Sequence, residues 1–248
     1  MLGVFCSAQM RASDPYDSTV LNSYMLKVGS AQRADTYLTP LHYSGWNGGV
    51  AYEHIRRFRS RPFLWRLNVE LDMDRTMNPV RNAAMYGAQF QARWSLLRSW
   101  EVCEALKLGA GGAGTFDVGA LYQRRNGNNP VAANASLTID LSAYATARFH
   151  IGRMPAFATY QASLPVVGAM FAPDYGQLYY EIYLGDRSGL LDVACWGRYF
   201  RLDQSLCVDL KAGPKYLRVG YGFDAVSTRA KGIVTQRVNH LFILGITL

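Results

Sequence analysis

Histidine is the side chain in this sequence best suited to chemistry, because imidazole titrates near neutral pH and can act as a general base. His240 is unusual, since Val238 and Phe242, two positions away on either side, are apolar, while Gln236 lies further along the same alternate row. Such a polar pair fits a serine–histidine acyl-transfer site or a contact with another protein. We favour a plainer interpretation, a local bulge that turns His240 out of the apolar row. No Gly-x-Ser-x-Gly motif is present, so we assign no catalytic residue and consider a non-enzyme the better supported class.

The other three histidines favour ordinary structural roles. His42 lies in a polar stretch and is predicted to be solvated in a loop. His54, between Tyr52 and Arg56, is predicted to fill or pair inside the fold, and His150 is predicted to make a hydrogen bond on a polar strand face.

A second candidate site is a loop at 165–187 that is rich in tyrosine and hydrogen-bonding groups. Its candidate binding residues are Asp174, Tyr175, Gln177, Tyr179, Tyr180 and Glu181. Aromatic rings with polar tips suit the recognition of sugar or protein surfaces. The alternative, which we favour slightly, is an ordered loop that packs its tyrosines against the rest of the fold.

The cysteines offer no metal site. Cys6 lies in the predicted signal-peptide remnant. The other three, Cys103, Cys195 and Cys207, lack metal-ligand spacing, and three cysteines cannot all pair with one another. We therefore predict packing roles, although an export compartment would permit one disulfide. We predict no bound metal and no cofactor.

Strict alternation of apolar and polar residues identifies the elements that must position these groups. In 63–74, Phe, Trp, Leu, Val, Leu and Met alternate with Leu, Arg, Asn, Glu, Asp and Asp, and the stretches 84–96 and 133–151 repeat the pattern. Successive side chains of a strand point to opposite faces, so each stretch is a strand with one apolar and one polar face. The polar faces supply a predicted interior network: Arg66, Glu70, Asp72, Arg93, Asp140, Arg148 and Arg237.

The length of the strands separates a membrane barrel from a soluble sandwich. Soluble strands average about five or six residues, whereas a tilted strand that spans a bilayer needs about 9–11, and the alternating stretches here are at least that long. A one-residue slip would turn Arg66 and its neighbours toward lipid, at up to roughly 2–4 kcal/mol for a basic residue near the bilayer midplane. The predicted fold class is therefore all-β: an antiparallel transmembrane β-barrel of about ten strands, eight to twelve remaining open.

Turn signals divide the chain into strands. Short connections are predicted at 59–62, 97–99, 152–155 and 202–204, and longer ones at 35–46, 75–82, 122–131, 165–187 and 225–231. The strands between them are 19–33, 47–58, 63–74, 83–96, 100–117, 132–151, 155–164, 188–201, 205–223 and 232–247. Short and long connections alternate, as periplasmic turns and outer loops do. Residues 19–248 form one barrel domain, and 1–18 are a signal-peptide remnant and lead-in, or alternatively a frayed terminus.

Composition narrows the compartment and the partners. The net charge is +8 and 18% of residues are charged, but no basic run or nucleic-acid motif occurs, which argues against nucleic acid. Outer-membrane lipid and lipopolysaccharide at the barrel rims are the better counterparts of the scattered basic residues. No uninterrupted apolar stretch is long enough for a membrane-spanning helix. Barrels of eight strands are filled by side chains, so a polar, side-chain-filled lumen is predicted here.

Three segments resemble a known family. Residues 35–45, Asn128-Asn129-Pro130 and, above all, 165–182 are similar to uncharacterised outer-membrane proteins of Bacteroidota, known as a domain of unknown function. The resemblance spans about 20–248 and implies the same compartment and a barrel fold. It implies no catalytic residues.

The sequence therefore predicts a Gram-negative outer-membrane barrel with a structural, binding or accessory-subunit role in the cell envelope. Gln236 and His240 become a candidate lipid-facing contact with another envelope protein. A lipid- or lipopolysaccharide-modifying enzyme is the alternative, followed by a narrow channel.

Overall fold

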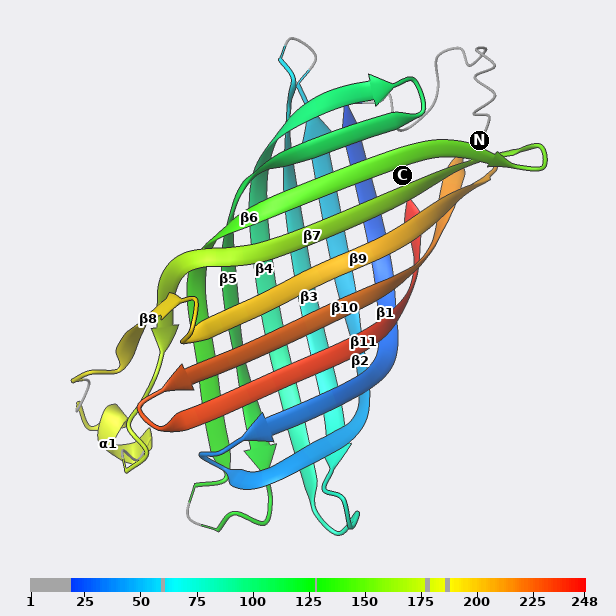
Figure 1. Ribbon diagram of the computed structural model, residues 1–248. Coiled ribbons are helices and arrows are strands. Elements are labelled where there is room, and N and C mark those ends of the chain that lie inside the picture. Colours follow the sequence, from blue (N-terminus) through cyan, green and yellow to red (C-terminus); the bar gives the residue numbers. More distant parts are fainter. Residues whose placement is uncertain (1–18, 59–60, 128, 177–178, 186–187) are drawn as a thin grey trace.

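The protein is a closed antiparallel β-barrel (Figure 1). The computed structural model describes residues 19–58, 61–127, 129–176, 179–185 and 188–248. The elements are β1 (Val20–Asp35), β2 (Thr39–Arg57), β3 (Phe63–Met77), β4 (Ala84–Cys103), β5 (Leu106–Gln123), β6 (Val131–Ile151), β7 (Met154–Phe171), α1 (Tyr179–Tyr183), β8 (Leu191–Cys195), β9 (Tyr199–Ala212), β10 (Lys215–Ala230) and β11 (Ile233–Thr247). Because β8 and β9 share one position in the wall, the barrel has ten wall strands, and the ten-strand prediction is confirmed.

Two seams close the cylinder. Each strand from β1 to β7 pairs with the next, β9 to β11 do the same, and the pairings β1–β11 and β7–β9 complete the ring. The short strand β8 pairs with the same edge of β7 as β9 does, at Val167–Phe171, so β8 and β9 together form one interrupted wall strand. The interruption contains Gly197 at φ 94°, a conformation that glycine adopts without steric cost.

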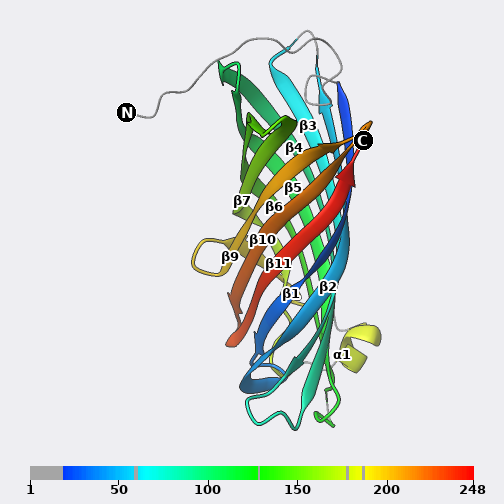
Figure 2. The same cartoon turned by 90° about the vertical axis from the view of Figure 1, so that its right-hand side faces the viewer.

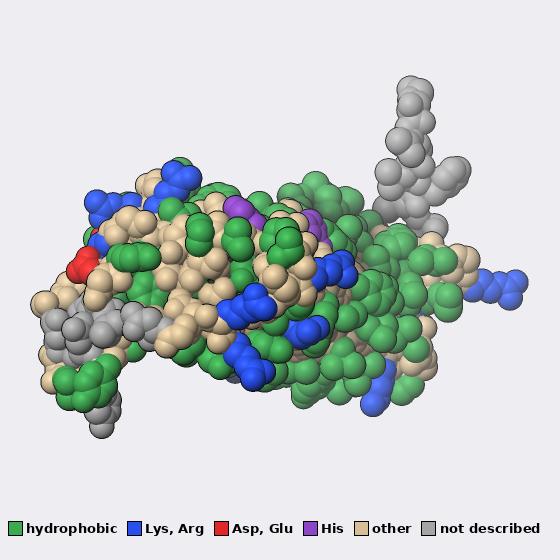
Figure 3. Space-filling view, turned by 90° about the horizontal axis from the view of Figure 1, so that it is seen from below, with side chains coloured by type: hydrophobic (Ala, Val, Ile, Leu, Met, Phe, Trp, Pro, Cys, Tyr) green, Lys and Arg blue, Asp and Glu red, His purple; other side chains and the backbone are tan. Residues whose placement is uncertain are grey.

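Alternation separates lipid-type and lumen-type side chains as predicted. On β3, Leu71 and Met73 are 42% and 57% exposed, whereas Arg66 and Asp74 between the outward residues are 2% and 7% exposed. The same parity holds along β4 and β6, where Trp94 is exposed on the outer face. Hydrophobic side chains accordingly cover a broad part of the wall in Figure 3.

The two ends of the barrel differ in their connections. We call the end with the turns 58–62, 104–105, 152–153 and 213–214 the short-turn end, and the opposite end, with 36–38, 78–83, 124–130, 172–190 and 231–232, the loop end. The C-terminus lies at the short-turn end and α1 at the loop end (Figures 1 and 2). Strands of 14 to 21 residues exceed the roughly 9–11 that a bilayer needs, so the wall extends beyond a membrane-thick band.

Two of the predicted short turns are wrong. Residues 97–99 continue β4, and 202–204 lie inside β9, where the polar run that suggested a turn instead alternates between lumen and outer face. The actual β9–β10 turn is Gly213-Pro214, with Gly213 at φ 66°. A turn signal of this type outweighs polarity alone, because only the former constrains φ.

The predicted long connections at 35–46 and 225–231 are also wrong. They are tight turns of 36–38 and 231–232, because the strands β1, β2 and β10 extend past the apolar band into polar sequence. The predicted lead-in at 1–18 lies outside the described residues. In the described part of the chain, no helix has the length and apolar character needed to cross a membrane.

Candidate functional site

The lumen next to the short-turn end holds a dense ion-pair cluster. Arg218 donates from Nε and Nη2 to both carboxylate oxygens of Asp209, at 2.9 and 3.0 Å, and from Nη1 to Glu53 at 2.6 Å. Arg66 Nε lies 3.0 Å from the other Glu53 oxygen, which also accepts from Gln161 at 2.7 Å. These charges are buried and mutually paired, so the cluster fills space rather than offering a free binding group.

The remaining predicted network residues meet partners from distant strands. Glu70 and Asp72 both accept from Lys27 Nζ, at 2.6 and 2.9 Å, while Arg93 pairs with Asp203. In further pairs, Asp140 accepts from Arg201, Arg237 bridges Asp117 and Asp224 at 3.2 and 3.0 Å, and Arg148 lies over the Phe157 ring at 5.7 Å. The predicted residues therefore form several pairs along the lumen, and Arg148 makes a ring contact with Phe157.

An apolar cluster closes the short-turn end of the lumen. Its members, which we call the apolar plug, point inward from seven strands and are at most 4% exposed: Leu21, Ile55, Leu64, Leu97, Tyr144, Phe157 and Tyr216. The rings of Phe157 and Tyr216 meet edge to face at 5.5 Å between centroids. Among the described residues, these side chains pack between the ion pairs and the short-turn end of the barrel.

The loop end keeps a cavity. We call it the mouth cavity; it measures about 90 Å³ and is lined by residues of β1, β3–β7, β9–β11 and α1, among them Arg33, Asp74, Leu121, Met170, Tyr179 and Arg237. Its charged groups are three carboxylates, of Asp35, Asp74 and Asp117, and two guanidinium groups. A second cavity of about 60 Å³ lies deeper, among the ion pairs of Lys27 and Arg93.

Aromatic rings form a collar at the mouth cavity. Tyr37, in the β1–β2 turn, meets Tyr175 and Tyr179 edge to face at 6.1 and 6.0 Å, and Phe171 stacks on Tyr179 at 6.5 Å. The Tyr179 hydroxyl accepts a hydrogen bond from the Ala133 backbone N–H at 2.7 Å. Burial raises the pKa of Tyr179 to about 12 and also raises that of Tyr37.

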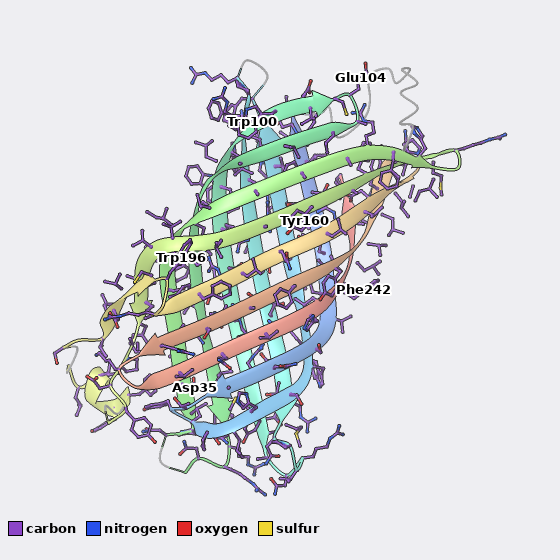
Figure 4. All side chains as sticks on the ribbon, viewed as in Figure 1. Asp35, Trp100, Glu104, Tyr160, Trp196 and Phe242 are labelled. Atoms are coloured by element: carbon purple, nitrogen blue, oxygen red, sulfur yellow. The ribbon has the colours of Figure 1, made fainter. Side chains whose placement is uncertain are left out.

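The loop that carries α1 is tied to the barrel. Lys231 Nζ pairs with Asp174 at 3.3 Å and donates to the Gly189 carbonyl. Lys231 itself has φ 49° and precedes Gly232 at φ 79°, the backbone of a tight hairpin turn that fixes the lysine's position. Trp196, labelled in Figure 4, donates to the Pro165 carbonyl at 2.6 Å.

The predicted loop residues split between packed and exposed positions. Tyr179 packs into the collar, as the alternative interpretation expected, while Asp174, Tyr175 and Tyr180 are exposed. Gln177 and the side chain of Glu181 lie outside what the structure describes.

His240 faces outward, so the predicted bulge is absent and the favoured interpretation of this residue is wrong. Its Nδ1 lies 2.6 Å from the Tyr221 hydroxyl and its ring is 5.1 Å from Phe223, both on β10. Phe242, the next outward residue, lies on the outer contour of the barrel in Figure 4. Gln236 shares this face and is half-buried.

His54 also corrects the prediction, because it faces outward rather than into the lumen. Its Nδ1 lies 2.8 Å from Asn22 Oδ1, which also accepts from Tyr52, and its ring packs on Trp65 at 4.8 Å. Tyr52 and Trp65 also lie on the outer face of the wall. The cross-strand pair Asn22–His54 brings the two polar side chains together. His42 and His150 are exposed.

Comparison with protein families identifies the chain. The model of DUF3316, a protein family of unknown function, matches residues 1–248. The chain belongs to the DUF3316 family. This agrees with the resemblance to an uncharacterised family. No curated protein matches the chain.

Solved structures similar to this DUF3316 barrel are distant. The translocator domain of the autotransporter NalP from Neisseria meningitidis is 6% identical with a TM-score of 0.37, over 94% of this chain and 89% of that one. OccK11 (OpdR) from Pseudomonas aeruginosa is 9% identical with a TM-score of 0.22, over 92% of this chain and 96% of that one. OpdL from the same organism is 10% identical with a TM-score of 0.21, over 92% and 98%. At these scores the likeness carries no functional inference.

Sequence reasoning missed several central residues of the DUF3316 barrel. Lys27, Glu53, Arg201 and Arg218 are buried at the heart of the ion pairs. The sequence does offer a clue to Lys27: it lies between the apolar residues Leu26 and Val28, so alternation predicts that its side chain faces the lumen. In the structure Leu26 and Val28 are exposed on the outer face. Among the described residues, no group of three or more His, Cys, Asp or Glu could hold a metal ion.

Proposed function

We propose that this protein is a non-conducting β-barrel of the Gram-negative outer membrane, in Bacteroidota, that serves as a binding or accessory subunit of the cell envelope. In this proposal the loop end lies on the outer side of the membrane, and its loops bind the partner. An outer face of exposed Leu, Val, Trp and Phe supports a lipid surrounding.

The difference between the two ends of the lumen carries this proposal. The apolar plug fills the short-turn end with side chains at most 4% exposed, so a continuous aqueous path is not expected. The loop end instead has the mouth cavity and an exposed surface at Asp174, Tyr175 and Tyr180. A barrel sealed at one end and elaborated at the other suits recognition rather than transport.

The rims supply a second contact with the envelope. At the loop end Arg81, Arg124 and Arg125 are exposed, and at the short-turn end Arg153 and Lys215 are exposed. Guanidinium and ammonium groups at these heights match the phosphates of lipopolysaccharide and of phospholipid head groups. Basic rims would hold the barrel upright while leaving the loop surface free for a protein partner.

Planar-bilayer recording combined with affinity purification tests the proposal. Purified protein is expected to show no steady conductance, and protein captured from detergent-solubilised envelopes of the native host should bring down a defined envelope protein. The variant Tyr175→Ser/Tyr180→Ser should lose that partner, whereas Tyr122→Ser, on the exposed outer face of β5, should retain it. Stable ohmic conductance, or equal recovery with all three proteins, would contradict the proposed role.

One observation favours the alternative of a lipid-modifying enzyme. His240 is outward-facing and oriented by Tyr221, and Ser30 stands opposite it in the β1–β11 register. In the described structure, however, no hydrogen bond joins the Ser30 hydroxyl to the imidazole, as an activated nucleophile requires. Release of fatty acid from phospholipid vesicles by the wild type, abolished in Ser30→Ala and in His240→Ala, would replace our proposal with this one.

A further inference from the structure

The barrel wall is incomplete between β6 and β7 at the loop end. The β6–β7 ladder begins at the pair Ser136–Met170, so within the described residues Val131–Ala135 pair only with β5. Pro173, just beyond the end of β7, has no N–H and cannot extend the ladder. Ala172 instead donates its N–H to Leu190, on the β8 side. A gap therefore separates the start of β6 from the end of β7.

The mouth cavity reaches into this gap. Inward residues of β6 such as Ala132 line it, but so do Ala133 and Ala135, which alternate to the outer face. On the opposite side, Met170 faces inward and Phe171 outward, and both line the cavity. The lining of the mouth cavity therefore includes the ends of both strands that border the gap.

Tyr179 occupies the gap. Its hydroxyl takes the hydrogen bond of the Ala133 N–H that an extended β7 would otherwise take, and its ring stacks on Phe171. The Tyr179 hydroxyl thus satisfies the Ala133 N–H in place of a backbone carbonyl. A change of the Tyr179 rotamer would break this single hydrogen bond and open the gap.

The chemistry of the cavity defines what could enter. Its side next to the gap is apolar, with Leu121, Met170 and Phe171. On its polar side, Asp74 is 7% exposed; its Oδ2 accepts from Arg33, but its Oδ1 is buried without a hydrogen-bond partner. A buried carboxylate oxygen of this kind is costly unless a donor satisfies it. With three carboxylates against two guanidinium groups, the cavity favours a neutral or cationic donor over an anion.

Size adds a further limit. A cavity of about 90 Å³ exceeds what one water needs, about 10–15 Å³, but is too small for a whole lipid. It fits a small polar head with the start of a chain, and the rest of the chain would leave through the gap toward the outer face.

We propose that the gap between β6 and β7 is a lateral port, latched by Tyr179, through which the mouth cavity takes up the amine- or hydroxyl-bearing head of a single-chain amphiphile. This goes beyond the proposed envelope role and does not need a protein partner. The head group donates to Asp74 Oδ1, and the chain lies against Met170 and Phe171.

Binding of three probes with one chain length and different heads tests the port. Dodecylamine, 1-dodecanol and dodecanoic acid are added to the full-length protein in detergent, and adducts are measured by native mass spectrometry. We expect a one-to-one dodecylamine adduct, a weaker dodecanol adduct, and dodecanoic acid binding at least tenfold weaker than the amine. Asp74→Asn should reduce the preference for amine over acid about tenfold.

Matched variants separate the port from association with the outer surface. Ala135→Trp, which fills the gap, should weaken the amine adduct at least tenfold, whereas Ala143→Trp, on the outer face of β6 within the complete ladder, should not. Tyr179→Ala should speed exchange of the bound amine, and Tyr180→Ala, an exposed neighbour on α1, should not. Heat-modifiable migration on SDS gels confirms that each variant is folded.

Equal binding of all three probes, or binding unchanged by Ala135→Trp in a folded protein, would overturn the port. Either result leaves the non-conducting envelope role intact, because that role is tested by conductance and partner recovery.

Discussion

The two ends of the lumen differ in how their interior is filled: the short-turn end is packed with side chains, and the loop end contains a cavity. At the short-turn end, the apolar plug and the neighbouring cluster of Glu53, Arg66, Asp209 and Arg218 leave the interior filled and the charges paired. At the loop end, apolar residues and charged residues surround the mouth cavity, and a carboxylate oxygen of Asp74 stays unpaired. The filled interior at one end and the cavity at the other support a division in which the first end maintains the fold and the second offers space for a ligand.

The comparison also separates the roles of the connections. Turns at the short-turn end are as short as two residues, at 104–105, 152–153 and 213–214, and hold the plug strands in fixed register. The loop end carries the extended segment 172–190, whose contacts reach the barrel through Lys231 and the collar tyrosines. The proposed binding surface therefore lies on a segment that a rigid scaffold holds in place.

The largest effect that would test this division is expected from Arg218→Ala. The substitution leaves Glu53 and Asp209 buried without their main counter-charge, and loss of one partner of such a cluster costs about 3–5 kcal/mol. The free energy of unfolding in lipid vesicles, measured by urea titration and tryptophan fluorescence, should fall accordingly.

Two further variants sharpen the interpretation of Arg218. Arg153→Ala, at an exposed turn of the same end, should change stability by no more than about 0.5 kcal/mol. Adding Asp209→Asn to Arg218→Met should recover part of the loss, because Asp209 is then neutral while Glu53 keeps Arg66 as its counter-charge. A small effect of Arg218→Ala alone would mean that the short-turn end is not the stabilising one.

A smaller effect is expected when equivalent leucines at the two ends are truncated. Leu97, fully buried in the apolar plug, should cost about 2–5 kcal/mol on replacement by alanine. Leu121→Ala, beside the mouth cavity, should cost about 1 kcal/mol less, since a site with adjoining free space loses fewer contacts. Leu96→Ala, the outward neighbour of Leu97, is the control, because acyl chains can fill the vacated space. Equal losses for Leu97 and Leu121 would remove the contrast between the ends.

The smallest effect is expected from alkaline pH at the collar. Burial raises the pKa of Tyr179 to about 12, above the value of about 10 for a free tyrosine. The folded state therefore favours the protonated phenol; this contribution to stability is complete below pH 10 and is lost as pH rises toward 12. Tyrosinate absorbance of the wild type minus that of Tyr179→Phe should show one group titrating near pH 12. A difference titrating near pH 10 would place Tyr179 in solvent and the collar open.

The alternation of apolar and polar residues predicted the wall of the barrel well, because the sequence of each strand by itself shows which side chains face the lumen and which face outward. The outward and inward sets of 63–74, 84–96 and 133–151 appear as predicted on β3, β4 and β6. The strand count was correct even though the β9–β10 boundary was misplaced, since β8 and β9 together occupy a single wall position.

The sequence did not predict which charged residues pair with one another across the lumen. Arg93 and Asp203 are 110 residues apart, and the polar run around Asp203 predicts a turn where the structure has β9. Glu53 and Arg218 are 165 residues apart. Such pairs depend on the register of every strand between them, which alternation alone does not determine.

The outward-facing histidines, His54 and His240, show a different limit. Alternation placed His240 on the outer face, and the general cost of polar groups against lipid led us to discount that placement. The structure lowers the cost by pairing the imidazole with Tyr221, just as it pairs His54 with Asn22. Cross-strand partners of this kind become visible only when the neighbouring strand is known.

The seam between β1 and β11 has a consequence for assembly. Thirteen residue pairs from Ser23–Thr247 to Asp35–Thr235 join the earliest strand to the last, and Asn22 and Leu248 exchange backbone hydrogen bonds at its edge. Until the final strand emerges, both margins of the sheet expose unpaired amides that lipid cannot solvate. Insertion should therefore be an all-or-none event that waits for the completed chain, and a nascent protein lacking β11 would depend on some escort to hide its open margin.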